Sequence, residues 1–225
     1  MRQVRTLLLA LAAILLLPMA AAQAQLDQQQ LISQAQSTLE RMAVDSNYQQ
    51  HFRADLQAAK AVIIVPSFYK AGFFLGGEYG TGIVLSHNAD GTWSYPGFLT
   101  LGGGSFGLQI GAASSSVIFM IRSDSALRAV LNNQFKFGAD AGVTFAVVGA
   151  GIGGDTTSHG GADILAYSLS GVGLYGGLTL NGAVLSPKES WNAAYYGQSL
   201  SNRAIVLEQS ASNRGADPLR DALAR

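Results

Sequence analysis

A serine motif in the middle of the chain is the first feature whose residue types and spacing suit a reaction. Residues 103–107 read Gly-Gly-Ser-Phe-Gly and match the G-x-S-x-G pattern around the nucleophile of α/β-hydrolases. Asp140 or Asp155, and then His159, follow Ser105 in the chain order of such a hydrolase triad. A serine hydrolase that uses Ser105 is therefore one function to weigh.

That chemistry needs a strand that turns sharply into a helix directly after the serine. Residues 106–110 instead alternate Phe, Leu and Ile with smaller or polar residues, which predicts that the strand continues. Ser105 is then an ordinary strand residue, and we expect its replacement by alanine to be silent. The pattern favours a protein that is not an enzyme.

A second polar cluster has a spacing that suits metal ligands. Asp155, His159 and Asp163 form D-x3-H-x3-D, whose oxygen and nitrogen atoms are ligand types for a metal ion. They number only three and lie in a polar, glycine-bearing loop, where solvated side chains are the simpler interpretation. We therefore expect no metal and no other cofactor.

A glycine-rich turn precedes that loop. Residues 149–154 match the G-x-G-x-x-G pattern of dinucleotide-binding turns and follow an apolar strand. Such a site holds the pyrophosphate at the N-terminus of a helix, whereas residues 155–161 are a polar loop. The sequence disfavours a nucleotide site here.

The N-terminus has the order of a secretory signal peptide. Arg2 and Arg5 precede an apolar run over residues 7–17, and small residues follow at 20–24. We expect cleavage after Ala24 and export to the periplasm, with the mature protein soluble or peripherally attached to a membrane. No cysteine follows the run to carry a lipid anchor.

Charge and cysteine content narrow the classes of partner. Without Arg2 and Arg5, 12 basic residues face 14 acidic ones, a balance that argues against nucleic-acid binding. The chain contains no cysteine, so burial of apolar side chains must hold the 201 residues of the mature chain together. A chain of that length can form a single domain.

Periodicity and glycine content predict the elements. Apolar residues at helical spacing indicate an amphipathic helix over residues 26–43, and further helices are expected at about 49–60, 124–133 and 218–224. A β-branched run over residues 61–66, with Pro66 at its end, reads as the first strand. Asp90-Gly91 predicts a hairpin into a strand at residues 92–95.

The glycines indicate the fold class. Of the 27 glycines, 25 lie between Gly72 and Gly182, where period-two alternation dominates. We predict an α+β fold: N-terminal helices over 25–60, a strongly curled, mostly antiparallel, barrel- or sandwich-like sheet within 61–200, and a helical tail over 201–225. Glycines inside strands mark bends and close backbone approach, which fits a curled sheet. Core packing or a ligand site would explain six aromatic residues: Trp93, Tyr95, Phe98, Trp191, Tyr195 and Tyr196.

Glycine and aromatic residues recur in a series of short segments: Ala59–Pro66, Lys70–Phe73, Gly76–Gly80, Gly91–Pro96, Gly107–Gly111, Ala166–Ser168, Gly173–Gly177, Leu180–Gly182 and Trp191–Gly197. In this order, over about residues 30 to 200, they resemble the SYLF domain family. The family is a lipid-binding and actin-binding domain that also occurs in bacterial exported proteins.

The resemblance implies a non-enzymatic domain that contacts membrane lipid or phospholipid, with the helix ahead of the first strand contributing. We expect actin binding to be unlikely for an exported protein. The candidate lipid-binding residues are Leu31, Ile32, Leu39, Arg41, Met42, Lys60 and Lys70. The apolar helix face has a second interpretation, in which it packs on the sheet.

Two other classes stay open beside lipid binding. Alternating glycine-rich strands behind a signal peptide also suit an integral outer-membrane β-barrel or a structural envelope protein. The helical first part and the helical C-terminus speak against the barrel. A serine hydrolase at Ser105 is the less favoured third class.

Overall fold

A computed structural model describes residues 25–72, 75–106, 111–132, 134–140, 142–148, 161–170 and 180–225. The predicted signal peptide, the glycine turn at 149–154, and Asp155 and His159 lie outside the described residues, as do 107–110 of the strand expected after Ser105.

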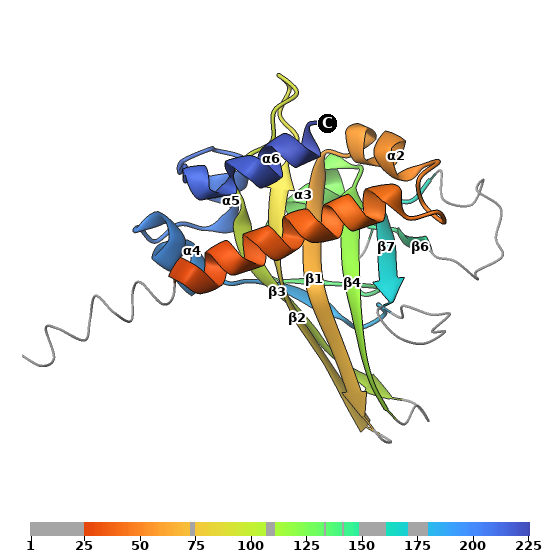
Figure 1. The fold of residues 1–225 in the computed structure, drawn as a ribbon. Helices are drawn as coiled ribbons and strands as arrows, with labels where there is room; N and C mark the ends of the chain where they lie inside the picture. The colour runs from red at the N-terminus through yellow and green to blue at the C-terminus, as the bar shows by residue number, and fades with distance from the viewer. Residues whose placement is uncertain are drawn as a thin grey trace, which may run out of the picture.

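A long helix over residues 25–44 crosses the sheet diagonally (Figure 1). It confirms the predicted amphipathic helix. The other helices are α2 (Phe52–Ala58), α3 (Asp124–Leu131), α4 (Glu189–Tyr196), α5 (Asn202–Val206), a 3-10 turn η1 (Arg214–Ala216) and α6 (Asp217–Leu223). Ser123 caps the predicted helix α3, because the Ala126 N–H donates to the Ser123 hydroxyl at 3.2 Å.

Eight strands form one sheet in the order β5-β8-β3-β2-β1-β4-β7-β6. They are β1 (Ala61–Gly72), β2 (Leu75–Ser86), β3 (Gly97–Phe106), β4 (Gly111–Ile121), β5 (Phe135–Lys136), β6 (Phe145–Val148), β7 (Ile164–Ser170) and β8 (Val184–Pro187). Every pairing is antiparallel except that of β6 with β7. The predicted α+β class with a mostly antiparallel sheet is confirmed.

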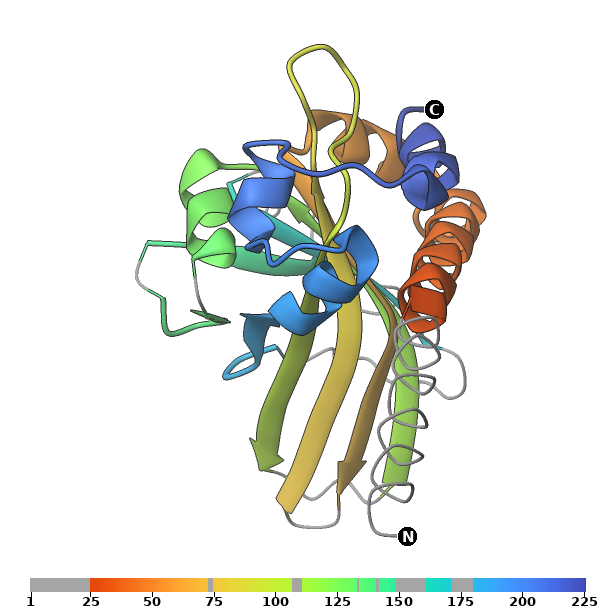
Figure 2. The ribbon, with the colours of Figure 1, turned by 90° about the vertical axis from the view of Figure 1, so that its left-hand side faces the viewer.

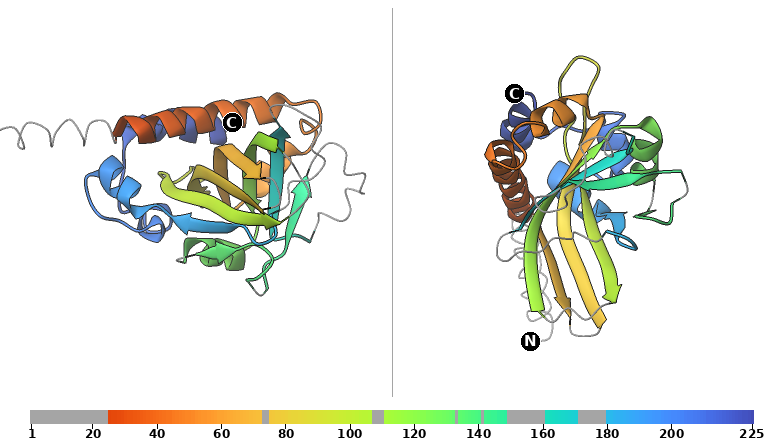
Figure 3. Two further views of the ribbon diagram at one scale, coloured as in Figure 1. Left: turned by 90° about the horizontal axis from the view of Figure 1, so that it is seen from below. Right: turned by 90° about the vertical axis from the view of Figure 1, so that its right-hand side faces the viewer.

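The sheet curls strongly, as the view from below in Figure 3 shows. Phe137 directly follows β5 at one edge of the sheet, and Phe145 begins β6 at the other edge. Their ring centroids lie 5.4 Å apart in an edge-to-face contact, and Phe137 also stacks on Phe119 of β4. The aromatic contacts therefore draw the two edges toward each other.

Apolar side chains bury both faces of the central strands. On one side, which we call the helix face, Val62, Ile64, Ile118 and Met120 pack with the helix of residues 25–44, α2 and α6. On the opposite face, residues such as Ile63, Phe119 and Ile121 pack with α3 and α5. This strict alternation along β1 and β4 is the period-two pattern of a strand buried on both sides.

A β-bulge in β1 corrects the predicted end of that strand at Pro66. Ile64 pairs with Ile83 and Ser67 with Thr81, so two residues of β1, Val65 and Pro66, face one residue of β2. Proline lacks an N–H, and a bulge is one of the few places where a sheet tolerates it. The strand therefore continues to Gly72.

The strand predicted at residues 92–95 is also corrected. Only Trp93 pairs there, in a single bridge to His87, and β3 begins at Gly97. The Arg220 side chain donates a hydrogen bond to the Trp93 carbonyl at 2.8 Å, and Trp93 is 2% exposed. Packing against the C-terminal helix therefore replaces the expected strand ladder.

Candidate functional site

The lower parts of β1 to β4 project beyond the helices (Figure 2). We call this part the distal sheet; it comprises residues 67–72, 75–81, 102–106 and 111–116. The parts nearer the helices, residues 61–65, 82–86, 97–101 and 117–121, are the proximal sheet. No described helix covers the helix face of the distal sheet in either Figure 2 or Figure 3.

Two tyrosines stand on this uncovered face. Tyr69 of β1 and Tyr79 of β2 are direct cross-strand partners, and they are 57% and 52% exposed. The Tyr79 hydroxyl lies 3.3 Å from the Thr81 hydroxyl two residues along the same strand. Paired aromatic side chains of this kind support each other across a sheet.

The β1 bulge decides which face the tyrosines occupy. Val65 and Phe68 both lie on the face opposite the helix face although they are three positions apart, because the bulge shifts the alternation by one. Tyr69 consequently falls on the helix face. The bulge also needs glycine opposite it, since a Cβ on Gly82 would lie 2.7 Å from the Ile64 carbonyl oxygen.

Small, uncharged residues surround the two rings. Register and alternation place these other described residues of the distal sheet on the same face: Ser67, Gly77, Thr81, Gly102, Gly104 and Ser114. Together with Tyr69 and Tyr79 they form what we call the tyrosine face. It is a neutral surface with two amphipathic rings, the type of side chain that has one apolar part and one wet end.

Arg41, a candidate from the sequence, borders the tyrosine face. Its guanidinium donates to the Ser116 hydroxyl at 3.4 Å and to the Thr38 hydroxyl at 3.2 Å. Ser116 in turn donates to the Pro66 carbonyl at 2.7 Å, inside the bulge. The structure thus brings one predicted cation next to a surface that the sequence did not single out.

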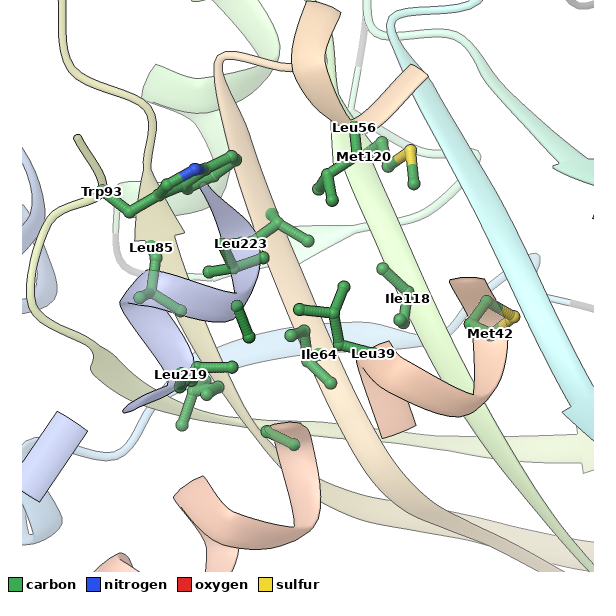
Figure 4. Close-up of a cluster of buried hydrophobic side chains, with 14 of the residues drawn as sticks. Leu39, Met42, Leu56, Ile64, Leu85, Trp93, Ile118, Met120, Leu219 and Leu223 are labelled. Carbon is green, nitrogen blue, oxygen red and sulfur yellow. The ribbon is translucent and has the colours of Figure 1, made fainter. Parts of the chain in front are cut away.

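The four apolar candidates of the long helix lie in the core. Leu31, Ile32, Leu39 and Met42 are 7%, 2%, 1% and 0% exposed. Figure 4 shows Leu39 and Met42 turned toward the strands that carry Ile64 and Ile118. In this conformation their contacts are with the sheet, and a role for them in lipid binding stays a prediction.

The two lysine candidates lie far apart. Lys60 directly precedes β1 at the proximal end and forms a surface ion pair with Asp124 at 2.8 Å. Lys70 sits in the distal part of β1, in register with Glu78 of β2, and its side chain lies outside the described residues. Ten residues of strand separate them by about 33 Å, so they do not share a site.

The motifs for catalysis and metal binding are only partly described. The backbone of Ser105 pairs with Gly76 within β3, as expected for a strand residue rather than a turn into a helix. Asp163 accepts hydrogen bonds from the Thr144 N–H and hydroxyl, and hydrogen bonds from Ser123 and Thr144 lower its pKa. Among the described residues no group of three or more metal-ligating side chains gathers.

The six aromatic residues named from the sequence belong to the packing around the helices. Trp93, Phe98 and Tyr195 are buried, and the Tyr196 hydroxyl donates to the Pro96 carbonyl at 2.7 Å. Burial raises the pKa of the Tyr195 and Tyr196 hydroxyls. The interpretation of these residues as core is the one that the structure supports.

Comparison with known proteins places the fold in a family. A family model described as "Las17-binding protein actin regulator", named Ysc84, matches residues 102–225, more than half of the chain. The chain belongs to the Ysc84 family. This is the SYLF family that the glycine and aromatic motifs resemble.

Several relatives share the domain at low identity. An SH3 domain-containing protein of Schizosaccharomyces pombe is 29% identical over 73% of this chain and 38% of its own length. Protein YSC84 of Saccharomyces cerevisiae is 27% identical over 73% and 35%. The SH3 domain-containing YSC84-like protein 1 of Xenopus laevis is 30% identical over 60% and 41%. The chain thus spans well under half the length of these relatives.

The sequence motifs did not indicate the tyrosine face. Tyr79 stood out only as one anchor of the family resemblance, and Tyr69 did not stand out. The usable signal was Val65-Pro66 followed by Gly80 and Gly82, because a proline inside a strand marks a bulge and a bulge inverts the faces beyond it. Within the described residues, no helix combines the length and apolar character that crossing a bilayer requires.

Proposed function

We propose that this chain is an exported, non-enzymatic protein that binds membrane lipid through the tyrosine face. The observation that carries the proposal is the uncovered pair Tyr69 and Tyr79 on the neutral, projecting sheet. Tyrosine rings concentrate where apolar and aqueous surroundings meet, as at the boundary between headgroups and acyl chains. Membership of the Ysc84 family supports a binding role over catalysis.

Contact through the sheet disturbs the fold less than insertion of the long helix. Leu31, Ile32, Leu39 and Met42 already contact apolar strand residues. Moving them into a bilayer exchanges one apolar environment for another and gains little. It also exposes Ile64 and Ile118 to water, at a cost of about 1.5–3 kcal/mol for each fully exposed side chain. Binding with the helix docked avoids that cost.

The proposal is tested by co-sedimentation of residues 25–225 with vesicles of phosphatidylcholine, and of phosphatidylcholine mixed with phosphatidylglycerol. We expect the protein to pellet with vesicles, and the double change Tyr69→Ser and Tyr79→Ser to abolish pelleting with only a small change in the thermal midpoint. Both rings are more than half exposed, so their removal has little effect on folding. Failure of the unchanged protein to pellet with either vesicle contradicts lipid binding.

Actin is the second candidate partner, because the family description names an actin regulator. The expectation that actin is an unlikely partner depended on export and has no support from the family. Co-sedimentation with filamentous actin, run beside the vesicle assay, separates the two. Pelleting with filaments and not with vesicles would favour the actin-binding role.

Export is a separate part of the proposal and has its own measurement. The full-length chain is expressed in a Gram-negative bacterium and the periplasm is released by osmotic shock without detergent. We expect the protein in the released fraction, with Gln25 as the N-terminal residue by Edman degradation. An intact N-terminus in the cytoplasmic fraction contradicts export.

A further inference from the structure

Arg41 carries an inference about the headgroup, which rests on the proposed function. We propose that Arg41 binds the phosphate of a membrane phospholipid and thereby fixes how the tyrosine face sits on the bilayer. The occupant is a phospholipid bilayer surface. The lipid contact then combines one cation at the edge of the sheet with two rings at its centre.

The first support is position. Arg41 contacts Ser116, and Ser114 lies two residues further along the same face of β4, about 7 Å away. Ser114 is the direct register partner of Tyr69, and Tyr69 is the partner of Tyr79. Arg41 therefore lies against β4, and Tyr69 and Tyr79 follow on the two neighbouring strands β1 and β2.

The second support is the charge that Arg41 presents. The residue is exposed, and it forms no ion pair with a carboxylate of the described residues. Its neighbour Glu40 instead accepts a hydrogen bond from Gln36 at 2.9 Å on the exposed side of the helix. A guanidinium has five N–H donors in a planar fork that matches phosphate oxygens, and the two hydroxyl contacts leave most of them available.

The third support is charge complementarity of the whole surface. The side chains of the tyrosine face are neutral, so Arg41 is the charge at its border on the side of the long helix. A bilayer presents the matching arrangement, with phosphates at one depth and an apolar boundary just below them. Hydrogen bonds to Thr38 and Ser116 hold the guanidinium near this border.

The test measures vesicle affinity for matched arginine variants of residues 25–225. Arg41→Gln removes the proposed phosphate ligand, and Arg53→Gln removes the same charge from an exposed position of α2. On vesicles with phosphatidylglycerol we expect Arg41→Gln to weaken binding about tenfold, since it deletes a charge-assisted hydrogen bond. Arg53→Gln should bind as the unchanged protein does.

A reporter shows whether the tyrosine face itself meets the lipid. The chain has no cysteine, so Gly77→Cys, whose Cβ enters open space on that face, takes one environment-sensitive fluorophore. A second preparation carries the label at Leu207→Cys, which follows α5 on the opposite face of the sheet and is 37% exposed. We expect a blue-shifted emission on vesicles at position 77 and none at position 207.

The outcomes separate the inference from the function beneath it. Equal binding by the two arginine variants overturns the role of Arg41 and leaves lipid binding in place. A shift at position 207 without one at position 77 overturns the tyrosine face as the contact. Glycerol phosphate that competes as strongly as vesicles overturns the bilayer as the occupant. No vesicle binding by the unchanged protein overturns both proposals.

Discussion

The proximal and distal halves of strands β1 to β4 differ in what covers them. In the proximal sheet Ile63 and Ile64 point to opposite faces and are both fully buried. In the distal sheet the strands carry Gly77, Gly102 and Gly104 and two exposed tyrosines on the helix face. The same strands run through both halves. The buried proximal half therefore anchors the exposed helix face of the distal half.

The two halves of the sheet therefore differ in what they contribute to stability and to lipid contact. Apolar burial at about 25 cal/mol per Å² stabilises the proximal sheet, whereas the small residues on the helix face of the distal sheet add little burial. Because the residues of the tyrosine face contribute little to folding, their replacement can change lipid binding without changing stability. Perturbations of the proximal sheet should therefore act on stability, and those of the tyrosine face on affinity.

The largest effect on stability is expected in the proximal core. Leu39→Ala should lower the free energy of unfolding by about 2–5 kcal/mol, because the side chain is 1% exposed and its loss leaves a cavity. Val44→Ala on the same helix, at 76% exposure, should change it by less than about 0.5 kcal/mol. Urea titration followed by circular dichroism measures both. Equal, small effects would mean that the helix is not docked in solution.

Two glycine substitutions compare the stability contributions of the proximal and distal sheet. Gly82→Ala should cost about 1–3 kcal/mol, since its Cβ would lie 2.7 Å from the Ile64 carbonyl oxygen and 2.8 Å from the Val65 side chain. Gly77→Ala places its Cβ in open space on the tyrosine face and should stay within about 0.5 kcal/mol. The same urea titration compares them, and a tolerated Gly82→Ala would contradict the described bulge.

Alkaline pH should destabilise the protein through its buried tyrosines. Burial raises the pKa of the Tyr167, Tyr195 and Tyr196 hydroxyls above their ordinary value of 10.0. Their contribution is complete below pH 10.0. Above that pH the unfolded chain releases protons that the folded chain keeps, so stability falls by at most about 1.4 kcal/mol per pH unit for each tyrosine.

Urea unfolding at a series of pH values from neutral to strongly alkaline measures this slope. Tyr196→Phe should make the slope shallower because it removes one of the three hydroxyls. A free energy of unfolding that stays constant above the ordinary tyrosine pKa, in the unchanged protein, would show that these hydroxyls ionise as readily when folded.

The smallest effect is expected at Lys60, a lysine predicted to bind lipid. Its ion pair with Asp124 is 2.8 Å long, but the two side chains are 44% and 60% exposed. Exposed pairs contribute about 0–1 kcal/mol, so Lys60→Ala should barely move the thermal midpoint. Because Lys60 lies at the proximal end, vesicle affinity should also stay unchanged. A marked loss of affinity would move the contact away from the tyrosine face.

Local signals predicted much of the fold. Helical periodicity located the long helix and α3, and the glycine pattern indicated a curled sheet. The features that the sequence did not predict depend on contacts between residues distant in sequence. The Trp93 carbonyl accepts a hydrogen bond from Arg220, 127 residues away, and no local pattern shows that partner.

The candidate site was predictable only in part. An amphipathic helix shows the same apolar stripe whether it meets a membrane or a sheet, so the sequence left the position of Leu39 open between them. Arg41 was among the candidates, but the position of Tyr69 on the same face depends on the one-residue shift at the bulge. One unrecognised bulge therefore assigns every following residue of the strand to the wrong face of the sheet.

Hydrogen–deuterium exchange with and without phosphatidylglycerol-containing vesicles shows which part of the protein meets the lipid. If the long helix stays docked, peptides from residues 25–44 keep their protection on vesicles, while peptides from residues 67–81 exchange more slowly. Loss of protection in residues 25–44 together with unchanged exchange in residues 67–81 would contradict this expectation, because the helix would then have left the sheet to meet the lipid.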